Sequence, residues 1–149
     1  MRVKKIEKLA KSEETVEMIL SEVRDSIKIV DETAKKLKRD ISDNPQTIRT
    51  LLSKVTGAHS DLKTAWGVVD TAKTNTQLDY YFKVKNTHDT KKDGKFNSTA
   101  TKEEARALVQ NYRRIRNYLQ AYVESASQDI STLQSLKKKT EQEFQTSGE

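Results

Sequence analysis

Three stretches of the chain place apolar residues at alternating steps of three and four, which is the heptad spacing of helices that pack side by side. They span residues 6–41, 48–72 and 105–136. Only Glu13 interrupts the first stretch, and Asp129 is the one misfit in the third. Because only two residues in seven are apolar, each stretch predicts the narrow seam of a coiled coil rather than the wider face of a globular helix.

The composition agrees with narrow seams. Hydrophobic and charged residues each make up 34% of the 149 residues, and the mean hydropathy is -0.86. A typical globular domain is about 45–50% apolar, so this chain cannot fill a thick core. One proline and four glycines leave few interruptions to long helices.

Turn-forming residues separate the seams. Asp43, Asn44 and Pro45 end the first helix, since Asp43 or Asn44 can cap the next helix and Pro45 suits its first turn. Periodicity then fails over about 83–100, where Asp93-Gly94 and nearby polar residues favour a loop or a short β-hairpin. The run from Thr101 to Glu104 is typical of a capping box.

We therefore expect residues 1–149 to form a single all-α domain, an elongated bundle of three long antiparallel helices. The expected helices cover about 3–41, 45–82 and 102–144, with a loop or small β-hairpin at about 83–100 inserted between helices 2 and 3. Each helix can cover only one narrow seam, so we expect the surplus apolar seam to be buried between subunits of a homo-oligomer.

Several classes of protein are disfavoured. The chain has no cysteine, which excludes disulfides, thiol catalysis and cysteine zinc sites. It has no apolar run of about 18 residues and no apolar run after its basic start, so we expect a cytoplasmic protein, in the host bacterium if viral. His59 and His88 lie in different elements without clustered carboxylates. We expect no enzyme activity, no metal site and no cofactor.

The charge is unevenly distributed. The net charge is +6, and residues 46–101 carry 9 basic and 5 acidic side chains, so this part holds +4 of it. Such a surplus favours a polyanionic partner, although it is also compatible with a basic protein that has no such partner.

One segment combines aromatic and basic residues. It holds Tyr80, Tyr81, Phe82, Lys83, Lys85, Lys91, Lys92, Lys95 and Phe96. Lysines that follow phosphates and rings that stack on bases are how proteins hold single-stranded nucleic acid. The alternative is that Tyr80 and Phe82 are buried in the end of the bundle while the lysines only keep the loop soluble.

Two further basic clusters follow. Arg113 and Arg114 lie off the third seam and, with Arg116, could extend the same nucleic-acid-binding surface. Pairing with acidic residues on a neighbouring helix is the alternative. Residues 137–139 are three lysines near a helix C-terminus, where cations stabilise the helix dipole, so we assign them no binding role.

The run Leu78-Asp79-Tyr80-Tyr81 ends a long helix, leads into a charged loop with Asp93-Gly94, and precedes a tyrosine-bearing helix over 103–130. This arrangement resembles the UvsY recombination mediator family of T-even-type bacteriophages. The resemblance implies a ring-shaped homo-oligomer that binds single-stranded DNA and helps load a recombinase on strands coated by single-strand-binding protein.

The chain departs from this family just before the run. The family has a lysine and an arginine where this chain has Asn75 and Gln77. If the resemblance holds, Lys83, Lys85 and the loop lysines must supply that charge.

Two function classes remain open from the sequence. The first is a single-stranded DNA-binding mediator or accessory protein. The second is a helical adaptor or assembly scaffold that binds a protein partner through its coiled-coil seams. We expect no membrane partner, because no predicted helix pairs a strongly apolar face with an opposing basic one.

Overall fold

The computed structural model describes residues 16–91 and 96–147, and every regular element in these ranges is an α-helix. The expected all-α class is therefore confirmed. The helices are α2 (Val16–Glu22), α3 (Arg24–Leu37), α4 (Pro45–Lys91), α5 (Ser98–Leu108) and α6 (Gln110–Ser147).

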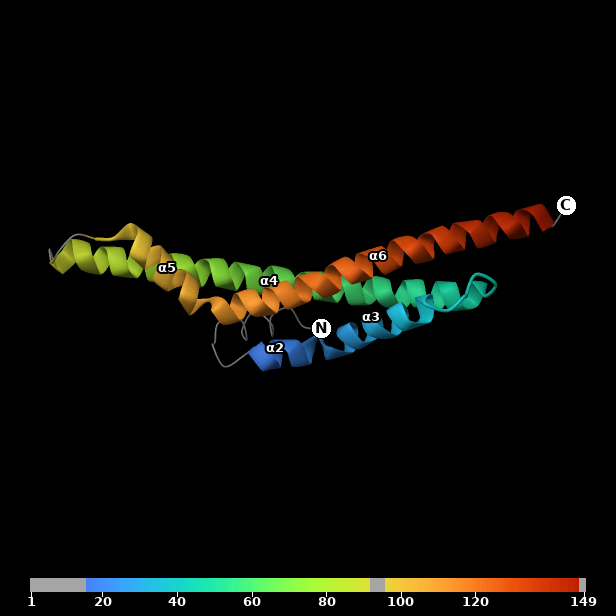
Figure 1. The fold of residues 1–149 in the computed structure, drawn as a ribbon, viewed down its shortest axis with the longest axis horizontal. Helices are drawn as coiled ribbons and strands as arrows, with labels where there is room; N and C mark the ends of the chain where they lie inside the picture. The colour runs from blue at the N-terminus through green and yellow to red at the C-terminus, as the bar shows by residue number, and fades with distance from the viewer. Residues whose placement is uncertain (1–15, 92–95, 148–149) are drawn as a thin grey trace.

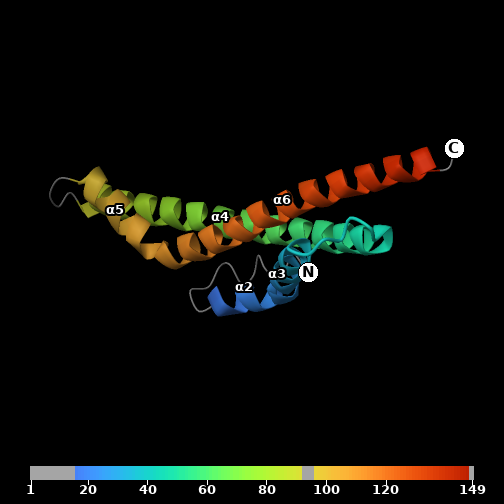
Figure 2. The same ribbon diagram turned by 45° about the vertical axis from the view of Figure 1, so that its right-hand side comes forward.

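The helix α4 is the central rod of an elongated molecule (Figure 1). It has 47 residues, about 70 Å at 1.5 Å per residue. The helices α3, α5 and α6 all pack against α4, and the C-terminal end of α6 extends beyond the N-terminal end of α4. Beside the C-terminal end of α4 both views show only α5 (Figures 1 and 2).

A single row of side chains on α4 forms the centre of the core. The row is Ile48, Leu51, Val55, Ala58, Leu62, Ala65 and Val69, and all are buried. Their alternating spacing of three and four is the one that the heptad pattern predicts. The alanines in the row are small, which allows neighbouring helices to approach α4 closely.

The connection between α3 and α4 has the predicted chemistry. Pro45 is the first residue of α4. The side-chain oxygen Oδ1 of Asn44 accepts a hydrogen bond from the backbone N–H of Thr47 at 3.1 Å, which identifies Asn44 as the N-cap. The two helices joined here run antiparallel, as the short connection requires (Figure 1).

The expectation of three long helices is wrong, because the first and third predicted helices are each interrupted within the described ranges. The interruptions fall at Val23, with φ -104° and ψ 7°, and at Val109, with φ -99° and ψ 16°. Both valines are buried. Each break therefore falls where the chain packs against neighbouring helices, and neither position is a glycine or proline.

The interruption at Val109 also shifts the third seam by one residue. The heptad frame places Leu108 in the seam, but Leu108 is 43% exposed and Val109 is fully buried. The seam therefore runs through Ala105, Val109 and Tyr112. A regular repeat drawn through 105–136 cannot show this shift, because it assumes one unbroken helix.

The predicted loop or β-hairpin over 83–100 is also wrong for its described part. Helix α4 continues to Lys91, α5 begins at Ser98, and residues 16–91 and 96–147 contain no strand. Residues 83–91 contain no glycine or proline, so backbone hydrogen bonds can carry the helix on after its apolar pattern has ended. Asp93 and Gly94 lie outside the described residues.

The capping box predicted at Thr101 is wrong for the same region. The N-cap of α5 is Asn97, whose Oδ1 accepts from the backbone N–H of Ala100 at 3.0 Å. Thr101 lies inside the helix, and its hydroxyl donates to the carbonyl of Asn97 at 2.9 Å. A cap four residues earlier was available, and it leaves Glu104 free for a contact with α4 that is described below.

Polar side chains occupy part of the first seam. Ser26 and Thr33 are buried on α3. The hydroxyl of Ser26 donates to Oδ2 of Asp61 on α4 at 3.3 Å, and the hydroxyl of Thr33 donates to the carbonyl of Ile29 at 2.7 Å. These hydrogen bonds remove the cost of burying the hydroxyls.

Asp129 on α6 is the misfit of the third seam, and its surroundings are unfavourable for a charged carboxylate. The side chain is half-buried, and its Oδ2 atom is buried without a hydrogen-bond partner. Burial raises the pKa of Asp129 above its usual value. The ionised carboxylate therefore disfavours the folded state at neutral pH.

We expect Asp129→Asn to raise the free energy of unfolding at pH 7 by about 0.5–1 kcal/mol, the low end for an unsatisfied polar group because the side chain is only half-buried. The gain should vanish as the pH falls through the folded-state pKa, since the wild-type carboxyl is then neutral too. Urea unfolding from pH 7 to pH 3.5 measures both effects. The exposed Asp79→Asn on α4 is the control, and a gain that stayed constant with pH would contradict the explanation.

Candidate nucleic-acid interface

The first part of the aromatic and basic segment is helical, and this determines which of its side chains lie together. Residues 80–91 form the last turns of α4. Side chains three and four apart share a face of a helix, and Lys85 is four residues after Tyr81 and three after Phe82. Tyr81, Phe82 and Lys85 therefore lie on one side of α4, and Tyr80 and Lys83 lie on another.

Tyr80 joins α4 to α5. Its hydroxyl donates to Oε2 of Glu104 at 2.8 Å. This hydrogen bond, followed by burial, raises the pKa of Tyr80. Tyr80 thus has a structural partner, which is closer to the alternative that it packs in the end of the bundle.

Phe82 does not share that role, because 51% of it is exposed. Its ring meets that of Tyr81 edge-on, with the centroids 5.4 Å apart and the planes at 84°. Tyr81 also meets Phe96 edge-on, at 5.6 Å and 76°. The ring of His88 lies 5.9 Å from Phe96. Four rings therefore gather where α4 and the start of α5 meet.

The lysines of the segment are only partly placed. Lys83 and Lys85 are exposed on α4. Lys91 is the last residue of that helix, and Lys92 and Lys95 lie outside the described residues. The structure thus brings Lys85 onto the side of Tyr81 and Phe82, and it places Lys83 away from them.

A groove of about 620 Å³ runs between α4 and α5 beside the ring cluster. Its lining residues are Thr74, Gln77, Leu78, Tyr81, Phe82, Lys102, Glu103, Ala105 and Arg106. Phe82 belongs to the predicted aromatic and basic segment, whereas Lys102 and Arg106 were not among the predicted site residues. The sequence signal for the two basic residues is their spacing of four, which places both on one face of α5.

The three arginines of α6 do not form one cluster. The Nη2 atom of Arg113 donates to the carbonyl of Arg106, so Arg113 lies next to the groove. Arg114 is exposed. Arg116 instead forms an ion pair with Asp70 on α4, with Nη1 and Oδ1 3.1 Å apart. The alternative of pairing with an acid on a neighbouring helix is thus observed for Arg116.

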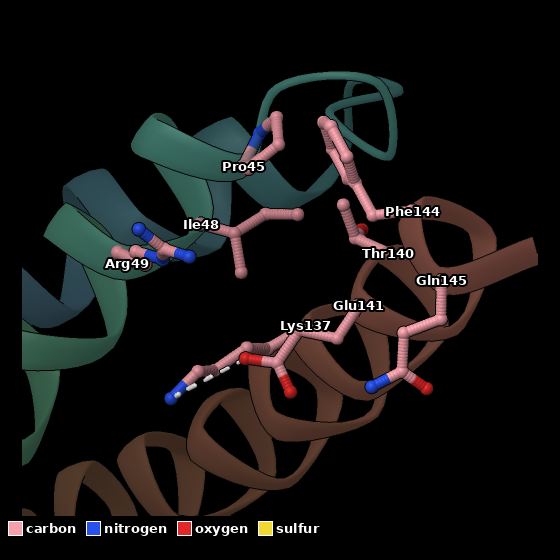
Figure 3. Close-up of a pocket in the computed structure, with 8 residues that line it drawn as sticks. All are labelled: Pro45, Ile48, Arg49, Lys137, Thr140, Glu141, Phe144 and Gln145. Atoms are coloured by element: carbon pink, nitrogen blue, oxygen red, sulfur yellow. Dashed lines mark ion pairs between the residues drawn. The ribbon is translucent and has the colours of Figure 1, made fainter. Parts of the chain in front are cut away.

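A second groove, of about 390 Å³, lies at the opposite end of the molecule between the start of α4 and the end of α6 (Figure 3). Pro45 and Ile48 line one side, and Thr140 and Phe144 line the other. Phe144 is 67% exposed. Apolar surface is therefore open to solvent at both ends of α4.

No three histidine, aspartate or glutamate side chains in the described part of the chain gather as metal ligands would. None of the helices described in these ranges combines the length and the apolar character needed to cross a bilayer.

No protein-family model, curated protein or solved structure matches this chain. The resemblance to the UvsY family therefore stays a prediction that rests on the quoted residues. The candidate interface has to be judged on its own geometry and charge.

We expect the Arg116–Asp70 pair to couple by about 0.5–1 kcal/mol in a double-mutant cycle of Arg116→Ala and Asp70→Ala, measured by urea unfolding. Both side chains are largely shielded, at 26% and 34% exposure. The matched control is the Lys28–Glu32 pair, 4.0 Å apart and exposed, for which we expect coupling near zero. Equal coupling in both cycles would contradict the pairing as a structural link.

Proposed function

We propose that this chain is a non-enzymatic, single-stranded DNA-binding oligomer that acts as a phage-type recombination mediator or accessory protein and helps load a recombinase on DNA. The single observation that carries the proposal is the half-exposed Phe82, held against Tyr81 beside Lys85, Lys102 and Arg106. Cationic side chains bind phosphates, and exposed ring faces stack on bases.

The position of this surface also supports the proposal. It lies at the end of α4 where only α5 accompanies it (Figures 1 and 2). A projecting end leaves room for a flexible strand to pass. In a homo-oligomer, several such ends would bind one strand, so modest contacts at each subunit would add up through avidity. Single-strand-binding protein and recombinase are the protein partners that this role requires.

We expect the protein to bind a labelled 30-nucleotide single strand with an affinity that falls steeply as salt rises, because phosphate contacts release counterions. Replacing Lys83, Lys85, Lys91, Lys92 and Lys95 together by alanine should lower the affinity at 50 mM salt at least tenfold and flatten the salt dependence. Fluorescence anisotropy across a salt series measures both quantities.

The matched control removes the same number of exposed lysines elsewhere, namely Lys28, Lys35, Lys36, Lys138 and Lys139. It should bind more tightly than the first variant although both have the same net charge. Circular dichroism should show equal helix content in both. Absence of binding by the wild type at 50 mM salt and micromolar protein would refute the proposed function.

A second candidate is a helical adaptor or assembly scaffold that binds a protein through an apolar seam. The observation in its favour is the groove at the other end of α4, with the exposed Phe144 at its rim. This reading is favoured over the first if the protein binds no single strand yet captures a protein partner in a nuclease-treated extract.

Both candidates involve apolar surface buried between chains, and this can be tested directly. We expect the molar mass in solution to be a multiple of the 17.1 kDa chain and to fall in Phe144→Glu, since a charge in a buried apolar contact is costly. Phe144→Leu should keep the wild-type mass. Light scattering after size exclusion provides the measurement, and a monomeric wild type would contradict the surplus-seam argument.

A further inference from the structure

The face of α4 that borders the α4–α5 groove carries apolar and aromatic side chains at a point where no third helix of the described ranges covers them. Leu78, Tyr81, Phe82 and Lys85 follow one another at steps of three, one and three, so they lie on one side of the helix. Leu78 and Phe82 are both about half-exposed. Exposed apolar side chains that cluster beside a groove are typical of a binding site.

The ring of Phe82 is half-exposed, and contact with a neighbouring ring restricts it on one side. Tyr81 packs against it edge-on, and Phe96 packs edge-on against Tyr81. A ring that is already restricted loses less side-chain entropy when a flat ligand stacks on it. The groove volume of about 620 Å³ is also in the range of small-ligand sites.

The charges around this groove favour an anionic ligand. Lys102 and Arg106 line it and Lys85 shares its face of α4, whereas Glu103 is its one acidic lining residue. Arg113 extends the basic surface, because its guanidinium lies against the carbonyl of Arg106. A ligand with both flat rings and phosphates matches this combination.

Acidic side chains lie at two borders of the basic surface around the groove. Towards the middle of the molecule Asp70 pairs with both Arg116 and Lys73, at 3.1 and 3.6 Å, so its single carboxylate offsets one of their two positive charges. On the other side of α4, Glu104 accepts the hydrogen bond of Tyr80. Phosphates are therefore favoured along the groove, where Glu103 is the one acidic lining residue.

We propose that the single strand binds in the α4–α5 groove: one base stacks on Phe82, and Lys102 and Arg106 bind the phosphates that flank it. This inference rests on the proposed function and specifies where on the protein the strand lies. The strand runs along α5 towards Arg113. Stacking on a ring accepts any base, so this site binds without sequence preference.

The test separates the base from the backbone by using two probes with equal numbers of phosphates, dT30 and an abasic 30-mer. We expect the wild type to prefer dT30. Phe82→Ala should weaken binding to dT30 about 5- to 150-fold, the range for the loss of one stacked base. Binding of the abasic strand should stay unchanged, and Phe82→Tyr, which keeps a ring, should retain the preference.

The basic residues should behave differently. The double variant Lys102→Ala with Arg106→Ala should weaken the binding of both probes equally. It should also make the fall of log affinity with log salt shallower by about 1.4, or about 0.7 for each lost phosphate contact. The controls are Tyr118→Ala, an exposed ring on the α3 side of α6, and Lys138→Ala with Lys139→Ala. Neither control should change the affinity for either probe.

The outcomes distinguish the inference from the function on which it rests. Wild-type protein that binds neither probe overturns both. If the wild type binds dT30 but Phe82→Ala leaves this binding unchanged, or weakens binding of both probes equally, the groove inference is wrong. The proposed function is then unaffected. Loss of dT30 preference in Phe82→Ala together with equal losses in the double variant supports the groove.

Discussion

The fold depends on burial of one row of apolar side chains along α4. The row from Ile48 to Val69 faces α3 on one side and α6 on the other. A chain with only 34% hydrophobic residues cannot build several cores. Sharing one central helix among its neighbours lets each of them bury its own narrow stripe against the same surface.

The candidate site follows from a mismatch in length between α4 and its partners. Helix α4 continues beyond Val69 to Lys91, and α5, with 11 residues, is the helix that accompanies this end. One neighbour covers one side of a helix, so Leu78 and Phe82 on another side remain half-exposed. The same surface that weakens this end of the bundle makes it suitable for a flat, charged ligand.

Local signals in the sequence were reliable where the structure depends on neighbouring residues. The start at Pro45 and the seam of α4 depend on short-range spacing and are as predicted, and of the two predicted caps, Asp43 and Asn44, the structure uses Asn44; the capping box predicted at Thr101 was wrong. The segment 83–91 shows the converse. Loss of apolar periodicity indicates that a helix has lost its packing partners, whereas the helix itself ends only where backbone hydrogen bonding or turn residues stop it.

The sequence alone determined that the chain is helical, that a narrow seam runs along residues 48–72, and that rings and lysines are concentrated near residue 82. The tertiary structure decided the kinks at Val23 and Val109 and brought Lys102 and Arg106 beside Phe82. The reason is physical: periodicity reports how one helix would bury its own side chains. Which side chains meet across two helices depends on the angle at which separate segments pack, and no local pattern encodes that angle.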